Sequence, residues 1–207
     1  MMSSQITPEE VPAQANAVSG SNEVIEPRCH EDARRIIDAA TAILAQGEIL
    51  LLTVSAETYQ QRVPQAFDAS MGGHYRHCLD HFTSLLRDLE GQKVDYDHRE
   101  RDVRIELHPE FALAATQRLR AQLEQLPLEC LEAPVQTRCE VSYAAGNAPV
   151  THSTLGRELV YAITHAIHHY ALMAVLSQLT NGPLPEHFGL APSTRRHRNS
   201  TTPGTAA

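Results

Sequence analysis

Apolar residues recur every three or four positions in four segments of the chain, the spacing that places them on one face of an α-helix. The first segment covers residues 29 to about 60 and the second covers residues 71–90. The third covers residues 110–125, and the fourth, which is the most apolar, covers residues 155–179. The pattern therefore predicts four helices that bury their apolar faces against one another.

Residues that favour helix ends stand at the boundaries of these segments. Ser70 is placed to cap the second helix, and Ser153 or Thr154 the fourth, because a hydroxyl oxygen accepts a hydrogen bond from an amide of the first turn. Pro109 stands at the first position of the third helix, where its missing N–H is not needed. An Asn-Gly-Pro run at 181–183 ends the fourth helix.

The links between the helices predict a crossover and a small amount of β-structure. Residues 92–108 are dense in charge, which is typical of a crossover and not of a core helix. Apolar and polar residues alternate from Val135 to Tyr143, and Gly146 with Asn147 forms a turn signal. The predicted fold is all-α, a four-helix bundle with a long crossover between helices two and three and a short β-like hairpin before helix four.

Composition divides the chain into one folded unit and two polar ends. Residues 1–27 are rich in Ser, Ala, Pro, Gln, Asn and Glu without apolar periodicity, which predicts a disordered N-terminal tail. Residues 28–190 hold all the predicted helices, and the length of 207 residues is typical of one domain plus flexible ends. Residues 191–207, with the basic run 195–198, predict a flexible, solvated C-terminal tail.

The charge and the cysteines of the chain indicate its cellular compartment and exclude some classes of binding partner. The formal net charge of −8 disfavours nucleic acid as a partner, because phosphate requires a basic face. No uninterrupted apolar run reaches the ~18 residues of a membrane span, and no secretory apolar region is recognisable. The absence of a C-x-x-C pair favours free thiols in a reducing cytoplasm. The cysteines are Cys29, Cys78, Cys130 and Cys139.

Histidines are the most informative polar residues of the predicted helices. His165 and His169 are four residues apart and therefore about 40° apart around the fourth helix, so both imidazoles can face one ion. His77 can add a third nitrogen from the second helix. Three neutral imidazoles leave a coordination position open, which is typical of a catalytic site, because a structural site fills the fourth position with protein.

Other uses of the histidines stay open at this point. His74 and His81 share about 60° of arc with His77, so either could replace it as a ligand. His168 lies about 60° from His165 on the side away from His169 and is less suited to the site. Because the chain has 12 histidines, accidental H-x-x-x-H pairs are also expected, and spacing alone leaves a surface or core role open.

The run Gly-His-Tyr-Arg-His-Cys-Leu-Asp-His-Phe at 73–82, with His-Ala-Ile-His-His at 165–169, resembles the DinB/YfiT-like superfamily of metalloenzymes. The resemblance covers roughly residues 29–190 and implies a bundle in up-down-down-up order. It implies that His77, three residues before Asp80, is the first metal ligand and that His165 and His169 are the others. Ala171 departs from the H-x-x-x-H-x-E pattern of sulfoxide-forming iron enzymes, which disfavours an oxygen-activating role.

Charged residues around the predicted ligands are candidates for catalytic roles. Glu158 lies two turns before His165 on the same helical face, where it can hold a histidine N–H or a substrate cation; the helix dipole alone also explains a glutamate there. Asp80 lies one turn from His77 and can orient it or accept a proton, unless it is simply exposed. The crossover residues can overhang the metal site, where Arg99 and Arg101 suit an anionic substrate group, although such a run is usually a solvated loop. The other candidates in this run are Tyr96, Asp97 and Asp102.

These features lead to a prediction of function. The cofactor is a divalent metal ion, with zinc or nickel favoured and iron possible, because three imidazoles suit several metals. The expected reaction transfers a low-molecular-weight thiol to a small electrophile, which rests on the thiol users among the proteins that the chain resembles. The alternatives are a metal-dependent hydrolase and a non-catalytic metal-binding stress protein. The apolar fourth helix also predicts a homodimer.

Overall fold

The computed structural model describes residues 29–87, 89–98, 100–144 and 146–201. The predicted tail at 1–27 therefore lies outside the described residues, as does Arg99. Where the sequence predicts a flexible C-terminal tail, the structure contains helix α7, Pro192–Thr201. Residues 192–201 lack an apolar face of the usual kind, and this explains why periodicity did not identify a helix there.

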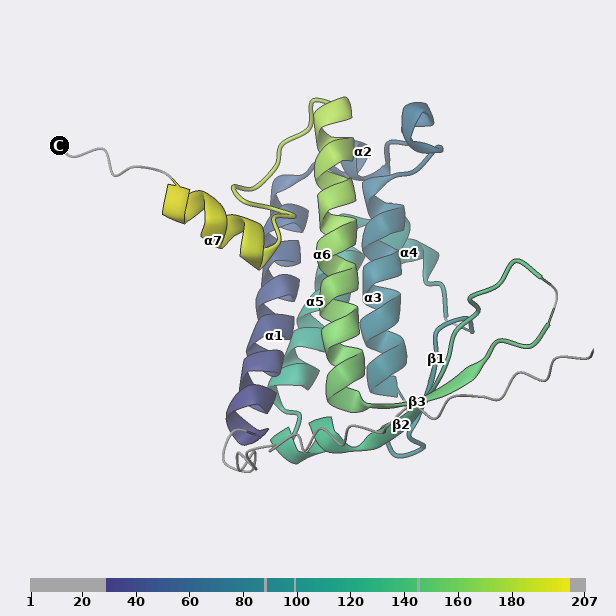
Figure 1. Cartoon of the computed structure of the whole chain (residues 1–207). Helices are drawn as coiled ribbons and strands as arrows, with labels where there is room; N and C mark the ends of the chain where they lie inside the picture. Colours follow the sequence, from purple (N-terminus) through teal and green to yellow (C-terminus); the bar gives the residue numbers. More distant parts are fainter. Residues whose placement is uncertain (1–28, 88, 99, 145, 202–207) are drawn as a thin grey trace, which may run out of the picture.

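Four long helices lie side by side and form the body of the protein (Figure 1). They are α1 (Cys29–Thr53), α3 (Met71–Arg87), α5 (Pro109–Glu124) and α6 (Leu155–Leu179). Helix α1 packs against α5 and α6, and α3 packs against α6 and α5. The mostly helical architecture is thus confirmed, whereas the up-down-down-up order stays a prediction.

A three-stranded sheet makes the all-α prediction incomplete. Its strands are β1 (Lys93–Asp95), β2 (Pro134–Arg138) and β3 (Val150–Thr154), in the order β1-β2-β3. Strands β2 and β3 form the expected hairpin, whereas β1 comes from the charged crossover and pairs with β2 in parallel. Only Val94 of β1 is apolar and buried, and such a short strand cannot be recognised from its own sequence.

Shorter elements break the predicted segments into smaller units. The first predicted helix ends at Thr53, and Ser55 then caps a separate helix α2 (Ala56–Gln60). Helix α4 (Val103–Leu107) lies within the crossover, capped by Asp102. The described residues also contain the 3₁₀ helices η2 (Pro64–Ala66) and η3 (Leu128–Glu132).

The two helices that carry the predicted metal ligands begin at the predicted residues. The Ser70 hydroxyl oxygen accepts a hydrogen bond from the Gly73 amide at 3.1 Å, at the start of α3. The Thr154 hydroxyl oxygen accepts one from the Arg157 amide at 3.2 Å, at the start of α6. These caps fix where each helix starts, and therefore which residues face the neighbouring helix.

Two helices are long and apolar enough, by length and composition, to cross a membrane: His30–Thr53 and Leu155–Leu179. A search for uninterrupted apolar runs does not identify them, because polar residues interrupt both segments. Both helices pack against each other in the bundle. Core helices of soluble proteins meet the same criterion, so the two helices are weak evidence for a membrane protein.

Candidate metal centre

Five histidine side chains meet between α3 and α6, and we call them the histidine cluster. They are His74, His77 and His81 from α3, and His165 and His169 from α6. Their spacing of three and four residues along α3, and of four along α6, places each set on one helical face. Neighbouring ring centroids lie 4.2 to 5.0 Å apart. Residues distant in sequence thus form one group of imidazoles.

Within the cluster, His77, His81 and His165 are arranged to share one ion. Their potential ligand atoms all lie within 4.8 Å of one another. The Nε2 atoms of His77 and His165 are 2.9 Å apart. Two nitrogens at ~2.0–2.1 Å from a tetrahedral ion are about 3.3 Å apart, so a small opening of this pair would admit zinc or a metal of similar size. The residues present therefore fit a metal ion.

His169, the remaining predicted ligand, borders this group. Its ring centroid is 4.7 Å from that of His77 and 4.5 Å from that of His165. Its Nδ1 atom is 2.8 Å from Nδ1 of His74. The structure thus brings the predicted residues His77, His165 and His169 together, and adds His81 and His74 as neighbours. The choice of ligands among them stays a prediction.

Burial keeps two histidines of the cluster, His74 and His169, electrically neutral. Burial, and then the neighbouring His77 and His165, lower the pKa of His169 to about 3. Burial also lowers the pKa of His74, and nearby His168 lowers it further. Both imidazoles are therefore uncharged at neutral pH, and neutral imidazole is the form that binds a metal.

We expect the metal-free protein to lose stability as the pH falls below about 6.5. Between this pH and the depressed pKa of His169, the unfolded chain binds a proton at this residue and the folded chain does not, so acid favours unfolding. One such histidine lowers the free energy of unfolding by up to about 1.4 kcal/mol for each pH unit of acidification, and partial solvent screening reduces this effect. Urea unfolding in the presence of a chelator, at several pH values, measures the slope.

The variant His169→Gln provides the control for this experiment. Glutamine does not titrate, so the variant should show a weaker dependence of unfolding free energy on pH. The same slope in both proteins would show that His169 does not contribute to it.

Two tyrosine side chains and one carboxylate lie beside His81 and His165. The Tyr96 hydroxyl donates a hydrogen bond of 2.7 Å to Oε2 of Glu158. The Tyr96 ring lies 5.1 Å from the ring of His81, and the Tyr161 ring lies 5.6 Å from that of His165. Burial, and then the bond to Glu158, raise the pKa of Tyr96, so its phenol stays protonated and remains a donor.

The predicted catalytic residue Glu158 is thus buried next to the cluster, with one oxygen bound to Tyr96. Tyr96 is one of the crossover residues expected to overhang the metal site, but its sequence context contains no signal that its hydroxyl would bind Glu158 of α6. Its position depends on β1, which ends one residue earlier and pairs with β2. The short strand therefore places a phenol at the site.

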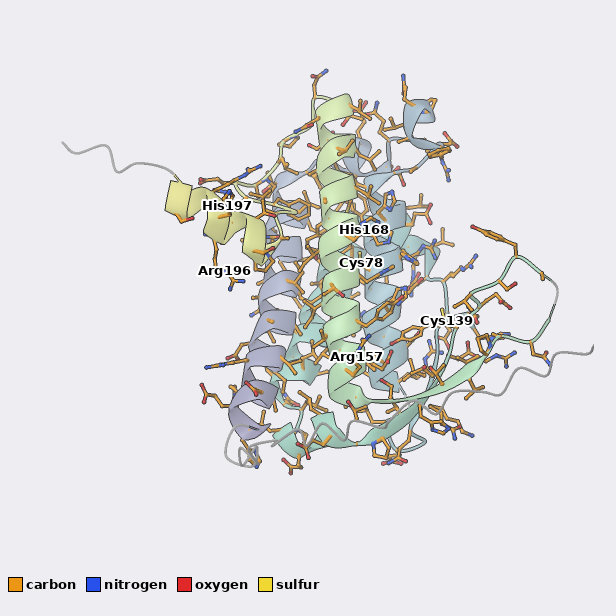
Figure 2. The ribbon with its side chains drawn as sticks, in the orientation of Figure 1. Cys78, Cys139, Arg157, His168, Arg196 and His197 are labelled. Atoms are coloured by element: carbon orange, nitrogen blue, oxygen red, sulfur yellow. The ribbon has the colours of Figure 1, made fainter. Side chains whose placement is uncertain are left out.

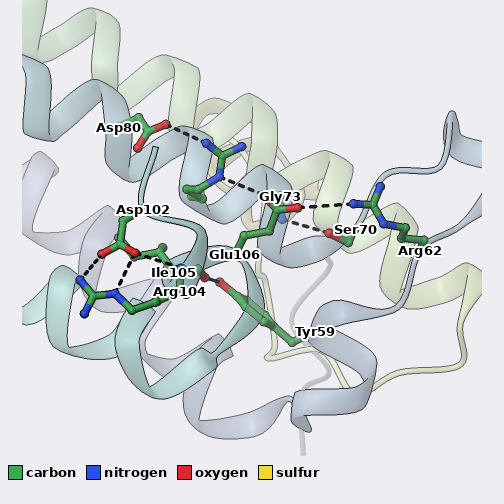
Figure 3. Close-up of polar contacts among 10 residues, drawn as sticks. Tyr59, Arg62, Ser70, Gly73, Asp80, Asp102, Arg104, Ile105 and Glu106 are labelled. Atoms are coloured by element: carbon green, nitrogen blue, oxygen red, sulfur yellow. Dashed lines mark hydrogen bonds and ion pairs between the residues drawn. The ribbon is translucent and has the colours of Figure 1, made fainter. Parts of the chain in front are cut away.

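Asp80 belongs to a network of charged side chains that joins α3 to α4 (Figure 3). Its Oδ2 lies 3.4 Å from an Arg76 nitrogen, and Arg76 Nε donates to Oε2 of Glu106 at 3.0 Å. Arg62 approaches the other oxygen of Glu106 at 3.7 Å. Asp80 is only 6% exposed, so the exposed-carboxylate alternative is wrong. Its catalytic role stays a prediction.

The remaining candidate residues are exposed, buried in the core or outside the described residues. Arg101 is exposed in the link before α4, and Arg99 lies outside the described residues, so a role for either in binding an anion stays a prediction. His168 is exposed, whereas Cys78 is buried inside the bundle (Figure 2). Burial raises the pKa of the Cys78 thiol, which suits a packing role and not a nucleophile.

Comparisons with known proteins agree with this picture. The family model described as the DinB superfamily matches residues 45–173, which are 129 of the 207 residues. FK506-binding protein 5 of Rhizopus delemar is 31% identical over 104 residues, which are 50% of this chain and 27% of that protein. The chain thus spans about a quarter of the length of this curated relative. No solved structure matches significantly. Because the family match covers more than half of the chain and includes the whole histidine cluster, the chain belongs to the DinB superfamily.

Proposed function

We propose that the protein is a metal-dependent transferase that joins a low-molecular-weight thiol to a small electrophile. The observation that carries the proposal is the cluster of imidazoles from α3 and α6, in which the potential ligand atoms of His77, His81 and His165 lie within 4.8 Å. A divalent ion held by neutral imidazoles keeps its full charge and lowers the pKa of a bound thiol or water. We favour zinc or nickel over iron, because Ala171 replaces the glutamate of the iron pattern.

Residues around the cluster supply the other functions that thiol transfer needs. Tyr96 orients the Glu158 carboxylate through its hydrogen bond to Oε2, which leaves Oε1 to accept a proton or to hold a histidine N–H. Asp80, held by Arg76, is a second acceptor on the α3 side. Arg101 is available for an anionic group on either reactant. The choice of thiol transfer over hydrolysis rests on the family resemblance.

Thiol consumption by the full chain tests this proposal. L-cysteine and 1-chloro-2,4-dinitrobenzene serve as probes: a C–S bond forms, the C–Cl bond breaks, and chloride and a proton are released. Zinc-loaded or nickel-loaded protein should accelerate the reaction, and His77→Ala should lower the rate by at least about 100-fold, a loss of ~2.7 kcal/mol in transition-state stabilisation. The variant His98→Ala is the control, because the His98 side chain is 75% exposed and lies outside the cluster.

The same protein preparations discriminate the alternatives. Cleavage of p-nitrophenyl acetate without thiol, lost in His77→Ala, would replace the transferase by a metal-dependent hydrolase. Metal binding without acceleration of either reaction would favour a non-catalytic metal-binding protein.

We also infer a cytoplasmic homodimer. Its support is the set of large apolar side chains that α6 leaves exposed, namely Val160, Val175 and Leu179. These residues would be covered by a second copy, and light scattering measures the mass.

A further inference from the structure

A pocket lies on the side of α6 that faces away from the histidine cluster, and we call it the C-terminal pocket. It has a volume of about 540 Å³, which is within the range of small-molecule sites. Helices α1 and α6 form its floor, and the segment after α6 together with α7 forms its roof. The floor consists of Ala39, Ala42, Ile43, Gln46, Ile163 and Ile167, and the roof contributes His187, Leu190, Pro192, Arg195 and Arg196.

The pocket is separate from the histidine cluster because the two use opposite faces of α6. At about 100° per residue, Ile163 and Ile167 are about 40° apart. His165 is about 200° from Ile163, so it points away from the pocket. In agreement, α7 lies next to α1 and on the opposite side of the bundle from α4 (Figure 1). The family match ends at residue 173, before the roof begins.

Packing holds the roof of the pocket in place. The Phe188 ring stacks on that of Tyr170 with centroids 4.7 Å apart, and Phe188 is only 3% exposed. The Gly189 amide donates to Oε1 of Gln46 on α1 at 3.3 Å. Gly189 has φ of +73°, and a Cβ atom at this position would lie 2.6 Å from the Tyr170 carbonyl oxygen. The chain therefore passes over the groove along a defined path, and the cavity below it is preformed.

The edge of the pocket that α7 forms is cationic, whereas His187, at the start of the roof, is paired with Glu186. Arg195 and Arg196 line it from α7, and Figure 2 shows Arg196 on this helix beside α1. Among the described residues neither arginine forms an ion pair, and residues 192–201 contain no Asp or Glu. Two guanidinium groups without a carboxylate partner are unexpected in a chain of net charge −8. They suit an anionic group placed at the mouth of the pocket.

From the apolar floor and the cationic edge, we infer that the C-terminal pocket binds a small amphiphile with a linear aliphatic chain and one anionic head group. The chain would lie along the isoleucines and alanines of α1 and α6, where it leaves water. The head group would receive hydrogen bonds from Arg195 and Arg196. A carboxylate and a phosphate share this chemistry, and a fatty acid or an alkyl phosphate would supply it.

Calorimetric titration of the full chain with four probes tests the inference: octanoate, octyl phosphate, 1-octanol and acetate. We expect saturable binding of octanoate or octyl phosphate at one site, and the tighter of the two identifies the head group. Acetate lacks the chain and 1-octanol lacks the charge, so each should bind at least about tenfold more weakly. The variant Ala42→Phe, which fills the floor from an exposed helix position, should reduce binding of the anionic amphiphile.

The double variant R195Q/R196Q should weaken binding of the anionic probe by about tenfold or more. The charge-matched control is R34Q/R157Q, which removes two exposed arginines that do not line the pocket. If 1-octanol bound as tightly as the anionic probe, or if R195Q/R196Q bound the anionic probe as tightly as the unmodified chain, the inference would be overturned. An equal loss in both double variants would show nonspecific attraction and would also overturn it.

Discussion

Protein purified with the double substitution His165→Ala/His169→Ala should contain less than about a tenth of the metal bound by the unmodified chain. Each substitution removes an imidazole from α6, and α3 alone cannot close a three-nitrogen site across the helix interface. Loss of a residue that only hydrogen-bonds a metal ligand lowers metal affinity by ~10–100-fold. Loss of a ligand itself should lower the affinity further. Elemental analysis of native protein measures the number of ions per chain.

Single substitutions then decide between the two candidates for the third ligand. His81 belongs to the group whose ligand atoms lie within 4.8 Å, whereas His169 is the position implied by the family pattern. The variant that loses its metal identifies the ligand, and the other should show only the smaller effect of losing a residue that hydrogen-bonds a ligand. His98→Ala, at an exposed position, should keep its full content. Full metal content in His165→Ala/His169→Ala would refute the proposed centre.

The second large effect is expected from Gly72→Ala near the start of α3. Helix propensity alone predicts that alanine stabilises this position, by up to about 1 kcal/mol. The structure predicts the opposite, because a Cβ atom here would lie 1.9 Å from the Glu106 carbonyl oxygen and 2.8 Å from the Tyr59 ring. The backbone of α4 must move away from α3, which should destabilise the protein by about 3 kcal/mol.

Urea unfolding and thermal melting measure this destabilisation. The melting temperature should fall by roughly 6–12 °C. Gly146→Ala is the matched control, because a Cβ atom at Gly146 would have no heavy atom within 4 Å. A variant Gly72→Ala as stable as the unmodified chain would contradict the close contact between α3 and α4.

The positions of the long helices and the starting residues of α3 and α6 could be predicted from the sequence because these features depend on local interactions. Apolar spacing identified the helical segments, and Ser70 and Thr154 cap α3 and α6 as expected. The separation of α2 from α1 was missed, because apolar spacing continues across the break after Thr53. Local patterns thus recognise helices well and their interruptions poorly.

For the candidate site, spacing along each helix sufficed to propose that His77 faces His165 and His169. The same spacing places His74 and His81 on that face, and it cannot rank them, because the rank depends on how α3 and α6 are rotated and shifted against each other. This relative placement arises from packing of the whole bundle. The structure therefore added His81 to the group with His77 and His165.

The sequence by itself determined the helical character, the helix starts at α3 and α6, and the grouping of imidazoles on one face of each of these helices, since each of these features follows from residues within about two turns of one another. Only the tertiary structure decided the contacts between distant segments. Examples are β1 pairing with β2, the Tyr96 phenol bound to Glu158, and the roof that encloses the C-terminal pocket. Such contacts depend on the balance of burial and chain entropy over the whole fold, and no local pattern encodes that balance.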